Sequence, residues 1–195
     1  LMYRVIGAHK TRTFRVLWAL EELGQPYAHE PHPPRADEVR AVNPSGKIPV
    51  LVDGDAVLTD SVAIMAYLAD KHGALSFPAG THDRARLDAE LNTLLETFDA
   101  TLWAGSQHRF ILPEAFRLPE IRATLEHQLT QAQSELVARL GDGPFLMGDE
   151  FTIADILAGH CGNWATSGRF PLDPAFRDYL ETLRARPAHT KVMGL

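Results

Sequence analysis

Short apolar runs and helical patterns alternate along residues 1–75. Residues 3–6, 48–52 and 56–59 are apolar runs bounded by glycine, proline or polar clusters, and residues 27–30 are a brief fourth strand candidate. Helices are predicted from Phe14 to Gly24, over residues 37–42, and from Asp60 to Gly73. The element order is β-α-β-α-β-β-α. Because a helical crossover joins the first two strands and a hairpin the last two, we expect a mixed four-stranded sheet with helices on both faces.

The pattern changes beyond residue 75. Residues 76–81 contain proline and glycine without periodicity, which indicates a linker. Helices are then predicted over residues 82–103, 119–140, 152–164 and 173–185, with no further strand. A mixed α/β half followed by a run of helices favours two segregated domains. We therefore expect an α/β domain at 1–75, a linker at 76–81 and an all-α domain, a helical bundle, at 82–195.

Composition narrows the functional classes. The formal net charge is −6, and the basic residues are scattered rather than gathered, so binding to nucleic acid or to an anionic membrane is not expected. Cys161 is the one cysteine, which excludes an internal disulfide and fits a reducing compartment. The sequence has no apolar leader, no stretch near the roughly 20 apolar residues of a membrane span, and no metal-ligand spacing. A cytoplasmic protein without a metal is therefore predicted.

The segment Lys47-Ile48-Pro49-Val50-Leu51 is the most informative local feature. Proline cannot donate to a sheet ladder, so Pro49 at the start of an apolar strand implies an edge position or a cis bond in a tight turn. Either geometry leaves the backbone groups of Ile48 free to pair with an extended, peptide-like ligand. A plain strand-start proline is the structural alternative.

Two predicted helix starts carry polar side chains. Asp60 and Ser61 begin the third helix, where unpaired N–H groups and the positive dipole end suit a carboxylate. Taken by itself, however, this feature favours ordinary capping, with Asp60 as the N-cap and nothing bound. Thr11 and Thr13 precede the first helix, where a hydroxyl and the dipole would stabilise a bound thiolate. These threonines are also typical of simple caps.

Taken together, these segments resemble the glutathione transferase superfamily over nearly the whole chain. Residues 11–24 are similar to the first-helix segment of many bacterial members, residues 43–51 to the cis-proline loop, and residues 58–64 to the segment that holds the γ-glutamyl group. Downstream, residues 151–156 resemble the family's buried capping box, with Thr152 and Asp155 satisfying each other's backbone donors. The resemblance implies a thioredoxin-like first domain, a homodimer, and glutathione as co-substrate.

The resemblance also assigns roles by position. Thr11 falls where serine-type members place the hydroxyl that activates the thiol, and Pro49 should be cis. The glutathione-binding residues would be Arg12, Thr13, Lys47, Ile48, Pro49, Asp60 and Ser61. Two positions depart from the family pattern, because threonine replaces serine at 11 and aspartate stands where glutamate is commoner at 60.

The leading hypothesis is a detoxifying enzyme that delivers the glutathione thiolate to an electrophilic small molecule. Glutathione-dependent reduction of peroxides or disulfides would leave the same residues, and a non-catalytic protein-interaction module is the alternative from another class. Candidate residues of the acceptor pocket follow the first long helix, and for the aromatic ones core or dimer packing is an equal alternative: Trp103, Gln107, His108 and Phe110.

Overall fold

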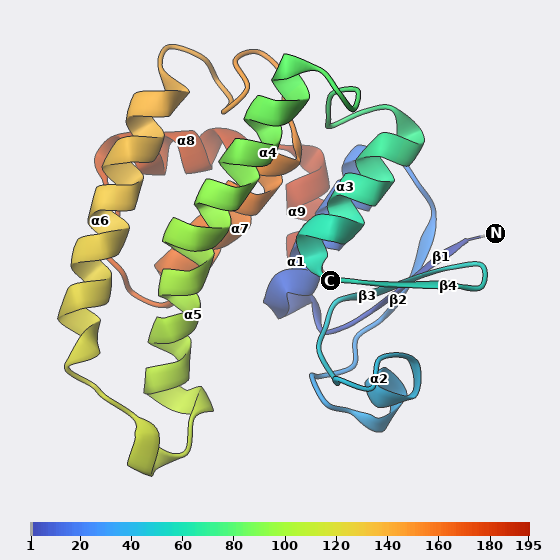
Figure 1. Ribbon diagram of the computed structural model, residues 1–195, viewed down its shortest axis with the longest axis horizontal. Helices are drawn as coiled ribbons and strands as arrows, with labels where there is room; N and C mark the ends of the chain where they lie inside the picture. The colour runs from blue at the N-terminus through green and yellow to red at the C-terminus, as the bar shows by residue number, and fades with distance from the viewer. Residues whose placement is uncertain (1) are drawn as a thin grey trace. The chain divides into compact units, whose positions relative to one another are not determined.

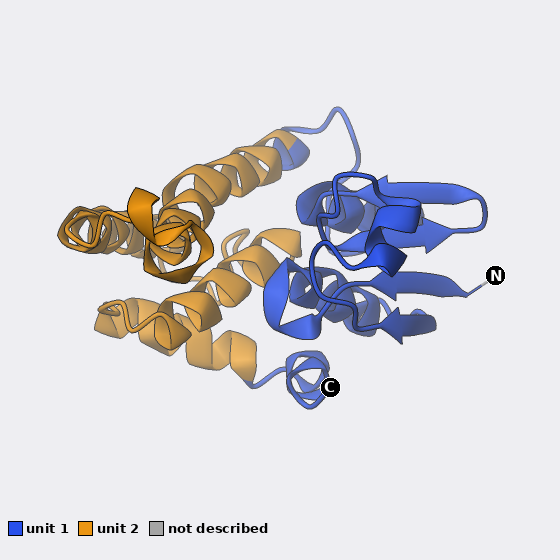
Figure 2. Ribbon diagram, turned by 90° about the horizontal axis from the view of Figure 1, so that it is seen from below, with its two compact units in different colours: residues 1–84, 185–195 blue, residues 85–184 orange. Residues whose placement is uncertain are grey.

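The computed structural model describes residues 2–195 and divides into two compact units. Figure 1 traces the chain, and Figure 2 colours the units. The first unit holds the residues up to Arg84 together with Ala185–Leu195, and the second holds Ala85–Arg184. The last eleven residues thus belong with the α/β unit, whereas the sequence pattern predicts that everything after residue 81 belongs to the helical domain.

The first unit is built on a four-stranded mixed sheet, which confirms the predicted architecture. Its strands are β1 (Tyr3–Ile6), β2 (Tyr27–Glu30), β3 (Val50–Asp53) and β4 (Ala56–Thr59), in the order β2-β1-β3-β4. The β1 and β2 strands pair in parallel across a helical crossover, whereas β3 pairs with both β1 and β4 in the antiparallel sense.

Helices cover both faces of this sheet, as the sequence predicts. They are α1 (Phe14–Glu22), α2 (Asp37–Val42) and α3 (Ser61–His72), with α1 and α3 on one side and α2 on the other (Figure 1). Ile6 and Val50 pack with Val39 of α2 in one apolar cluster. Their strand neighbours Val5 and Leu51 are fully buried on the opposite face, as the two-residue period of a strand requires.

A short final helix, α9 (Pro187–Met193), explains why the last residues join the first unit. Its proline occupies the first turn, where the missing N–H costs nothing. Arg186 donates two hydrogen bonds to the Glu22 carboxylate, at 2.6 and 2.7 Å. The buried ring of His189 lies edge-on to Phe14, with centroids 5.3 Å apart, and to Trp18, at 4.8 Å. These contacts fix α9 on α1.

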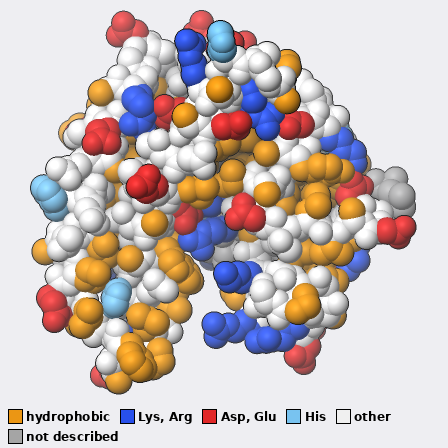
Figure 3. Space-filling model, in the orientation of Figure 1, with side chains coloured by type: hydrophobic (Ala, Val, Ile, Leu, Met, Phe, Trp, Pro, Cys, Tyr) orange, Lys and Arg blue, Asp and Glu red, His pale blue; other side chains and the backbone are white. Residues whose placement is uncertain are grey.

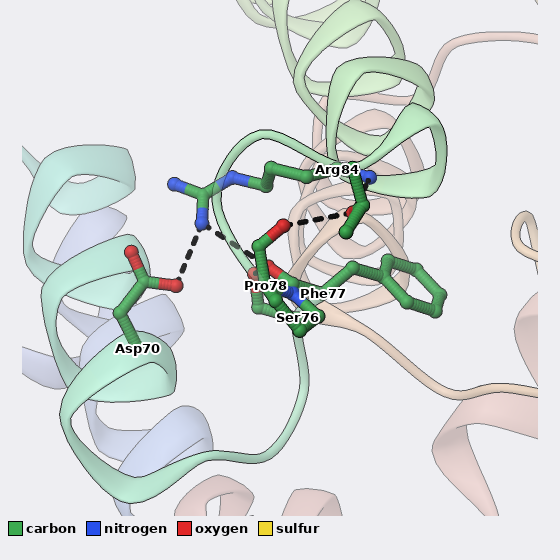
Figure 4. A network of polar contacts seen from close by, with 6 residues as sticks. Asp70, Ser76, Phe77, Pro78 and Arg84 are labelled. Atoms are coloured by element: carbon green, nitrogen blue, oxygen red, sulfur yellow. Dashed lines mark hydrogen bonds and ion pairs between the residues drawn. The ribbon is translucent and has the colours of Figure 1, made fainter.

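Polar contacts also hold the linker. The Arg84 guanidinium donates to the Asp70 carboxylate of α3 at 2.7 Å and to the Phe77 carbonyl at 3.3 Å (Figure 4). Thr81 Oγ1 donates to the Pro78 carbonyl at 2.8 Å. The segment without periodicity is therefore an ordered connection tied to the end of α3.

The second unit is all-helical. It begins at Ala85, within α4 (His82–Leu94), and so contains most of that helix. The other helices of the unit are α5 (Ala100–Ser106), α6 (Ile121–Leu140), α7 (Ile153–Ser167) and α8 (Pro174–Arg184). The helix predicted over residues 82–103 continues to Ile111, because wide turns at Leu95–Asp99 and Gln107–Ile111 extend it. The apolar stripe of Leu94, Phe98 and Leu102 stays buried through the first turn.

The predicted capping box is present at the start of α7. Thr152 N–H donates to Asp155 Oδ2 at 2.9 Å, and Ala154 N–H donates to Thr152 Oγ1 at 3.3 Å. Asp155 Oδ1 also accepts from Leu146 N–H, at 2.9 Å, and from the Tyr179 hydroxyl, at 2.7 Å. Burial raises the pKa of this carboxyl, whereas the donated hydrogen bonds lower it. The box thus ties α7 to α8 and to the preceding loop.

Candidate functional site

The sheet register gathers the predicted site segments at one end of the first unit. Ile6 of β1 pairs with Val50 of β3, and Val50 pairs with Thr59 of β4. Gly7, Pro49 and Asp60 each lie one residue beyond these partners, so the loops that contain them leave the sheet side by side. Antiparallel pairing of β3 with both neighbours produces this alignment.

Gly7 brings the first loop against the proline loop. Its φ of +142° is open to glycine, and a β-carbon there would lie 2.3 Å from Thr13 Oγ1 and 3.0 Å from Ile48 Cβ. The turn that precedes α1 and the proline loop, far apart in sequence, therefore meet at one glycine. Thr13 is fully buried in this contact.

The Thr11 hydroxyl lies in an irregular turn that precedes α1. Thr11 itself has extended dihedrals, φ −130° and ψ −168°, inside the segment His9–Thr13. Its Oγ1 donates to the Ala8 carbonyl at 2.7 Å, accepts from Thr13 N–H at 3.2 Å, and lies 3.0 Å from Thr13 Oγ1. Since a hydroxyl has one proton, donation to a ligand requires Thr11 to turn from Ala8. Thr11 is partly exposed, so it is the hydroxyl of this pair that a ligand can reach.

His9 is the titratable neighbour of this turn whose pKa is shifted. Desolvation lowers the pKa of His9, and the positive charge of Lys10 and the His29 ring lower it further. His9 is therefore neutral at pH 7, and the positive charge beside the Thr11 turn comes from Lys10 and Arg12. The first turn of α1 contains no acidic residue that would oppose an anion.

The peptide bond between Ile48 and Pro49 is cis, as predicted. The edge-strand alternative is wrong, because Pro49 leads into β3, which has neighbours on both sides. Across residues 2–195, neither backbone group of Ile48 has a hydrogen-bond partner, nor does the exposed ammonium group of Lys47. An extended ligand can pair with Ile48 here, and Lys47 can approach an anionic end of it.

Asp60 and Ser61 form the start of α3 and make different contacts there. Asp60 has the unusual φ of 70°, and its Oδ1 accepts from Val62 N–H at 2.9 Å and from Ala63 N–H at 3.0 Å. It is therefore a true cap whose second carboxylate oxygen remains for a ligand. Ser61 is buried, and its Oγ accepts from Arg15 Nη1 at 3.1 Å. The start of α3 is thus in contact with the cationic side chain of Arg15.

Comparison with known proteins decides the family. Residues 13–76 match the family model described as the N-terminal domain of glutathione S-transferase. Over 166 residues the chain is 34% identical to glutathione S-transferase 3 of Zea mays, covering 79% of this chain and 73% of that protein. The chain belongs to the glutathione S-transferase family. These relatives support the predicted function, a glutathione transferase.

Further relatives and solved structures of the family agree. The chain is 32% identical to human glutathione S-transferase theta-2B over 133 residues, which are 64% of this chain but 53% of that protein. The structure of glutathione S-transferase III in apo form superimposes with a TM-score of 0.81 at 26% identity, over 100% of this chain and 96% of that one. A glutathione transferase from Methylococcus capsulatus gives 0.84 at 25% identity, over 99% and 98%. The fold of this glutathione S-transferase family member is therefore typical throughout.

The predicted acceptor residues lie together in sequence but differ in their surroundings. Trp103 is on α5 and is 37% exposed, whereas Phe110 is 63% exposed in the turn that follows. Gln107 begins that turn and is partly buried. His108 alone of the four lines a cavity of about 740 Å³ in the helical unit, and its Nδ1 accepts from Leu118 N–H at 3.1 Å. Their role in binding an acceptor stays a prediction.

Sequence reasoning missed Arg15. It is 0% exposed, in a stretch of α1 where every residue from Phe14 to Leu20 is buried. A charged side chain on an otherwise apolar helix is the feature that could have identified it, since a buried guanidinium needs partners. Its partner Ser61 lies 46 residues away, and that pairing becomes visible only with the fold.

None of the helices in residues 2–195 is long and apolar enough to cross a membrane. In that part of the chain no three histidine, cysteine, aspartate or glutamate side chains come together in a way that could hold a metal ion.

Proposed function

We propose that this chain is a serine/threonine-type glutathione transferase in which Thr11 activates the thiol of bound glutathione. One observation carries the proposal: the sheet register brings the Thr11 turn, the cis-proline loop and the start of α3 to one end of the sheet. A tripeptide with an anionic group at each end and a thiol in the middle suits these three segments.

Each part of glutathione has a complementary group. The backbone of Ile48 pairs with the cysteinyl residue in the manner of an added strand. Asp60, through its second carboxylate oxygen, accepts from the γ-glutamyl ammonium, while Ser61 donates to the γ-glutamyl carboxylate. Lys47 approaches the glycyl carboxylate. These assignments rest on unpaired groups at the site and on the family's pattern.

The chemistry at the glutathione sulfur is stabilisation of the negative charge of the thiolate. A thiol with a pKa of about 8.5 is mostly protonated at neutral pH, and lowering that pKa by one unit raises the thiolate fraction roughly eightfold. A thiolate is a stronger acceptor than the Ala8 carbonyl, so the Thr11 proton turns to the sulfur when glutathione is bound. The dipole of α1 and the basic side chains of Lys10 and Arg12 favour the same charge.

The thiolate then attacks an electrophilic small molecule, with positioning rather than covalent attachment to the protein providing the rest of the rate. We place the acceptor beside Trp103, Gln107, His108 and Phe110. A homodimer in the cytoplasm is part of the same proposal. The family's pattern supports the dimer, and the single buried cysteine suits a reducing compartment.

The test compares Thr11→Val, which removes the hydroxyl and keeps the shape, with Thr11→Ser, which removes the methyl group. Glutathione binding is measured by calorimetry, thiolate formation by ultraviolet absorbance across pH, and turnover with a chlorinated aromatic acceptor. The matched control is Thr190→Val, since Thr190 is an exposed threonine on α9 whose hydroxyl also donates to a backbone carbonyl, at 3.4 Å.

We expect Thr11→Val to reduce turnover about 10- to 100-fold near neutral pH, with glutathione affinity within about threefold of wild type. The thiol pKa should rise in parallel, whereas Thr11→Ser and the control should retain activity. Unchanged turnover in Thr11→Val would remove Thr11 from the mechanism. Failure of the wild type to bind millimolar glutathione would instead favour a non-catalytic interaction module.

A further inference from the structure

Thr13 occupies the N-cap position of α1 but does not cap that helix. Its dihedrals are already helical, φ −60° and ψ −30°, and its side chain makes no capping hydrogen bond. Threonine at such a position ordinarily accepts a hydrogen bond from a backbone N–H of the first turn. The side chain is also fully buried, so its hydroxyl serves neither the helix nor the solvent.

The partner of this buried hydroxyl is Thr11. The two Oγ1 atoms lie 3.0 Å apart, and within residues 2–195 the Thr13 hydroxyl makes no other hydrogen bond. Thr11 has one hydroxyl proton, which it donates to the Ala8 carbonyl at 2.7 Å, because a carbonyl oxygen can only accept. The proton in the 3.0 Å contact is therefore donated by Thr13.

A second donor reaches the same oxygen. The backbone N–H of Thr13 donates to Thr11 Oγ1 at 3.2 Å. A hydroxyl oxygen has two lone pairs and one proton. Thr13 thus fills both acceptor positions of the Thr11 oxygen, one through its backbone and the other through its side chain. The proton is the part of the Thr11 hydroxyl that is left to interact with a ligand.

Packing against Gly7 keeps the Thr13 hydroxyl in place. A β-carbon on Gly7 would lie 2.3 Å from Thr13 Oγ1, so this oxygen lies directly against the glycine backbone. His29 of β2 holds that glycine, since its Nε2 lies 2.9 Å from the Gly7 carbonyl and must donate to it. The Thr13 hydroxyl is therefore fixed beside Thr11.

The protonation state of a ligand sulfur decides whether it suits the Thr11 hydroxyl. A thiolate accepts hydrogen bonds strongly, whereas a neutral thiol is a weak acceptor and would need a free lone pair as the acceptor of its own proton. Because both lone pairs of Thr11 Oγ1 are occupied, the neutral thiol finds no acceptor there. Two donors to the oxygen also polarise its O–H bond, which strengthens the hydrogen bond that Thr11 donates.

We propose that Thr13 is a positioning residue of the transferase, which fills both acceptor positions of Thr11 Oγ1 so that Thr11 meets the glutathione sulfur only as a hydrogen-bond donor. This positioning role rests on the thiol-activating role proposed for Thr11. Thr13 has no exposed surface, so we assign it this indirect role in place of the direct contact with glutathione that the resemblance implies. No proton passes between the threonines: the thiol proton leaves to water, and Thr11 shares its own proton with the sulfur.

Positive charge on the same unit would also favour a thiolate, and the two effects have to be separated. Figure 3 shows lysine and arginine side chains gathered at the lower right of the view, around α2. Salt screens the attraction between exposed charges, whereas it leaves a buried hydrogen bond such as that between Thr13 and Thr11 almost unchanged. The measurements are therefore made in about 0.5 M sodium chloride, where the Debye length is about 4 Å.

Thr13→Ser and Thr13→Ala form the critical pair, because these two side chains differ by one oxygen atom. The pKa of the thiol in bound glutathione is followed by ultraviolet absorbance across pH, and kcat and the KM for glutathione are measured with a chlorinated aromatic acceptor. Thr101→Ser and Thr101→Ala are the matched controls, since Thr101 is a buried threonine of α5 whose hydroxyl donates to the Thr97 carbonyl at 2.8 Å. Thr13→Ala is also made in the Thr11→Val background, and thermal unfolding verifies that each variant is folded.

Compared with Thr13→Ser, we expect Thr13→Ala to raise the pKa of the bound thiol by about 0.5 to 1 and to lower kcat about three- to tenfold at pH 7. The KM for glutathione should stay within about twofold, and the loss of kcat should disappear well above the raised pKa. The control pair should show no difference in either quantity. In the Thr11→Val background, Thr13→Ala should cause no further loss.

Two results would overturn the positioning role and leave the role of Thr11 intact. One is an equal pKa of the bound thiol in Thr13→Ser and Thr13→Ala. The other is a loss of kcat in Thr13→Ala that persists in the Thr11→Val background, since Thr13 would then act without Thr11. Unchanged turnover in Thr11→Val itself would remove the role of Thr11, and the positioning role with it.

Discussion

Replacing Arg15 by methionine tests whether a buried side chain controls glutathione binding without touching the ligand. Arginine can only donate hydrogen bonds, so the 3.1 Å contact from its Nη1 makes Ser61 Oγ the acceptor. The Ser61 proton must then point to another acceptor, and the γ-glutamyl carboxylate is the one proposed above. Methionine keeps much of the aliphatic volume but frees the hydroxyl to turn inward.

The expected loss of glutathione affinity follows from the energy of the hydrogen bond that the substitution removes. A hydrogen bond from a hydroxyl to a carboxylate contributes about 1.5 to 3 kcal/mol, which corresponds to a roughly 10- to 100-fold loss of glutathione affinity. Arg15→Met should therefore weaken binding by about as much as Ser61→Ala. Because both substitutions remove the same bond, the double variant should bind no more weakly than Ser61→Ala alone.

Calorimetric titration of glutathione into the wild type, both single variants and the double variant gives this double-mutant cycle. The pKa of the bound thiol should stay unchanged in Arg15→Met, since Arg15 acts at the γ-glutamyl end. Arg4→Met is a suitable control, because Arg4 pairs with Glu30 at 2.7 Å on an exposed part of the same sheet. Additive losses in the double variant, or wild-type affinity in Arg15→Met, would refute the positioning role.

Three further predictions concern stability. Asp60→Ala should lower the free energy of unfolding by about 1 to 2 kcal/mol, because it removes the cap of α3 and leaves alanine at a positive φ. Asp60→Gly should lower it less, and thermal denaturation distinguishes the two variants. Asp155→Ala leaves two buried N–H groups and two buried hydroxyl groups without their acceptor and should cost about 3 kcal/mol or more in urea denaturation, with Glu150→Ala as an exposed control. Hydrogen bonds from Lys71 and Tyr67 hold the pKa of Asp53 below its ordinary value near 3.8, so its contribution is present above about pH 4 and is lost as the pH falls further. Asp53→Asn should flatten that acid limb of a stability curve, and an unchanged limb would contradict the assignment.

Much of the α/β unit could be predicted because its determinants are local. The strand and helix bounds follow from apolar runs and from glycines that end them. In the helical unit, the capping box of Thr152 and Asp155 was expected from the resemblance to the family. The proline loop was recognised correctly as a cis turn, but its place in the sheet was not settled, since strand order depends on pairing between distant segments.

The remaining features depend on contacts across the chain. The helix α9 is seven residues long, too short for a clear period, and its place on α1 is set by pairs such as Lys191 with Glu21, 170 residues apart. The continuation of the first long helix to Ile111 uses wide turns that have no sequence pattern of their own. The pairing of Arg15 with Ser61 becomes visible only once segments 46 residues apart are placed together.

A plain structural explanation was available for each of three site residues, Thr11, Pro49 and Asp60. In the structure, that explanation is compatible with the proposed functional role. Asp60 caps α3 with one carboxylate oxygen and keeps the other. Thr11 closes its turn with a proton that a stronger acceptor can attract. What separates a site from three ordinary caps and turns is the register of β1, β3 and β4, which places the unpaired backbone of Ile48 between them. A register shift of one residue would turn these positions to the opposite face and leave each local motif intact. The proposed binding site is therefore a property of the sheet as much as of the residues that would line it.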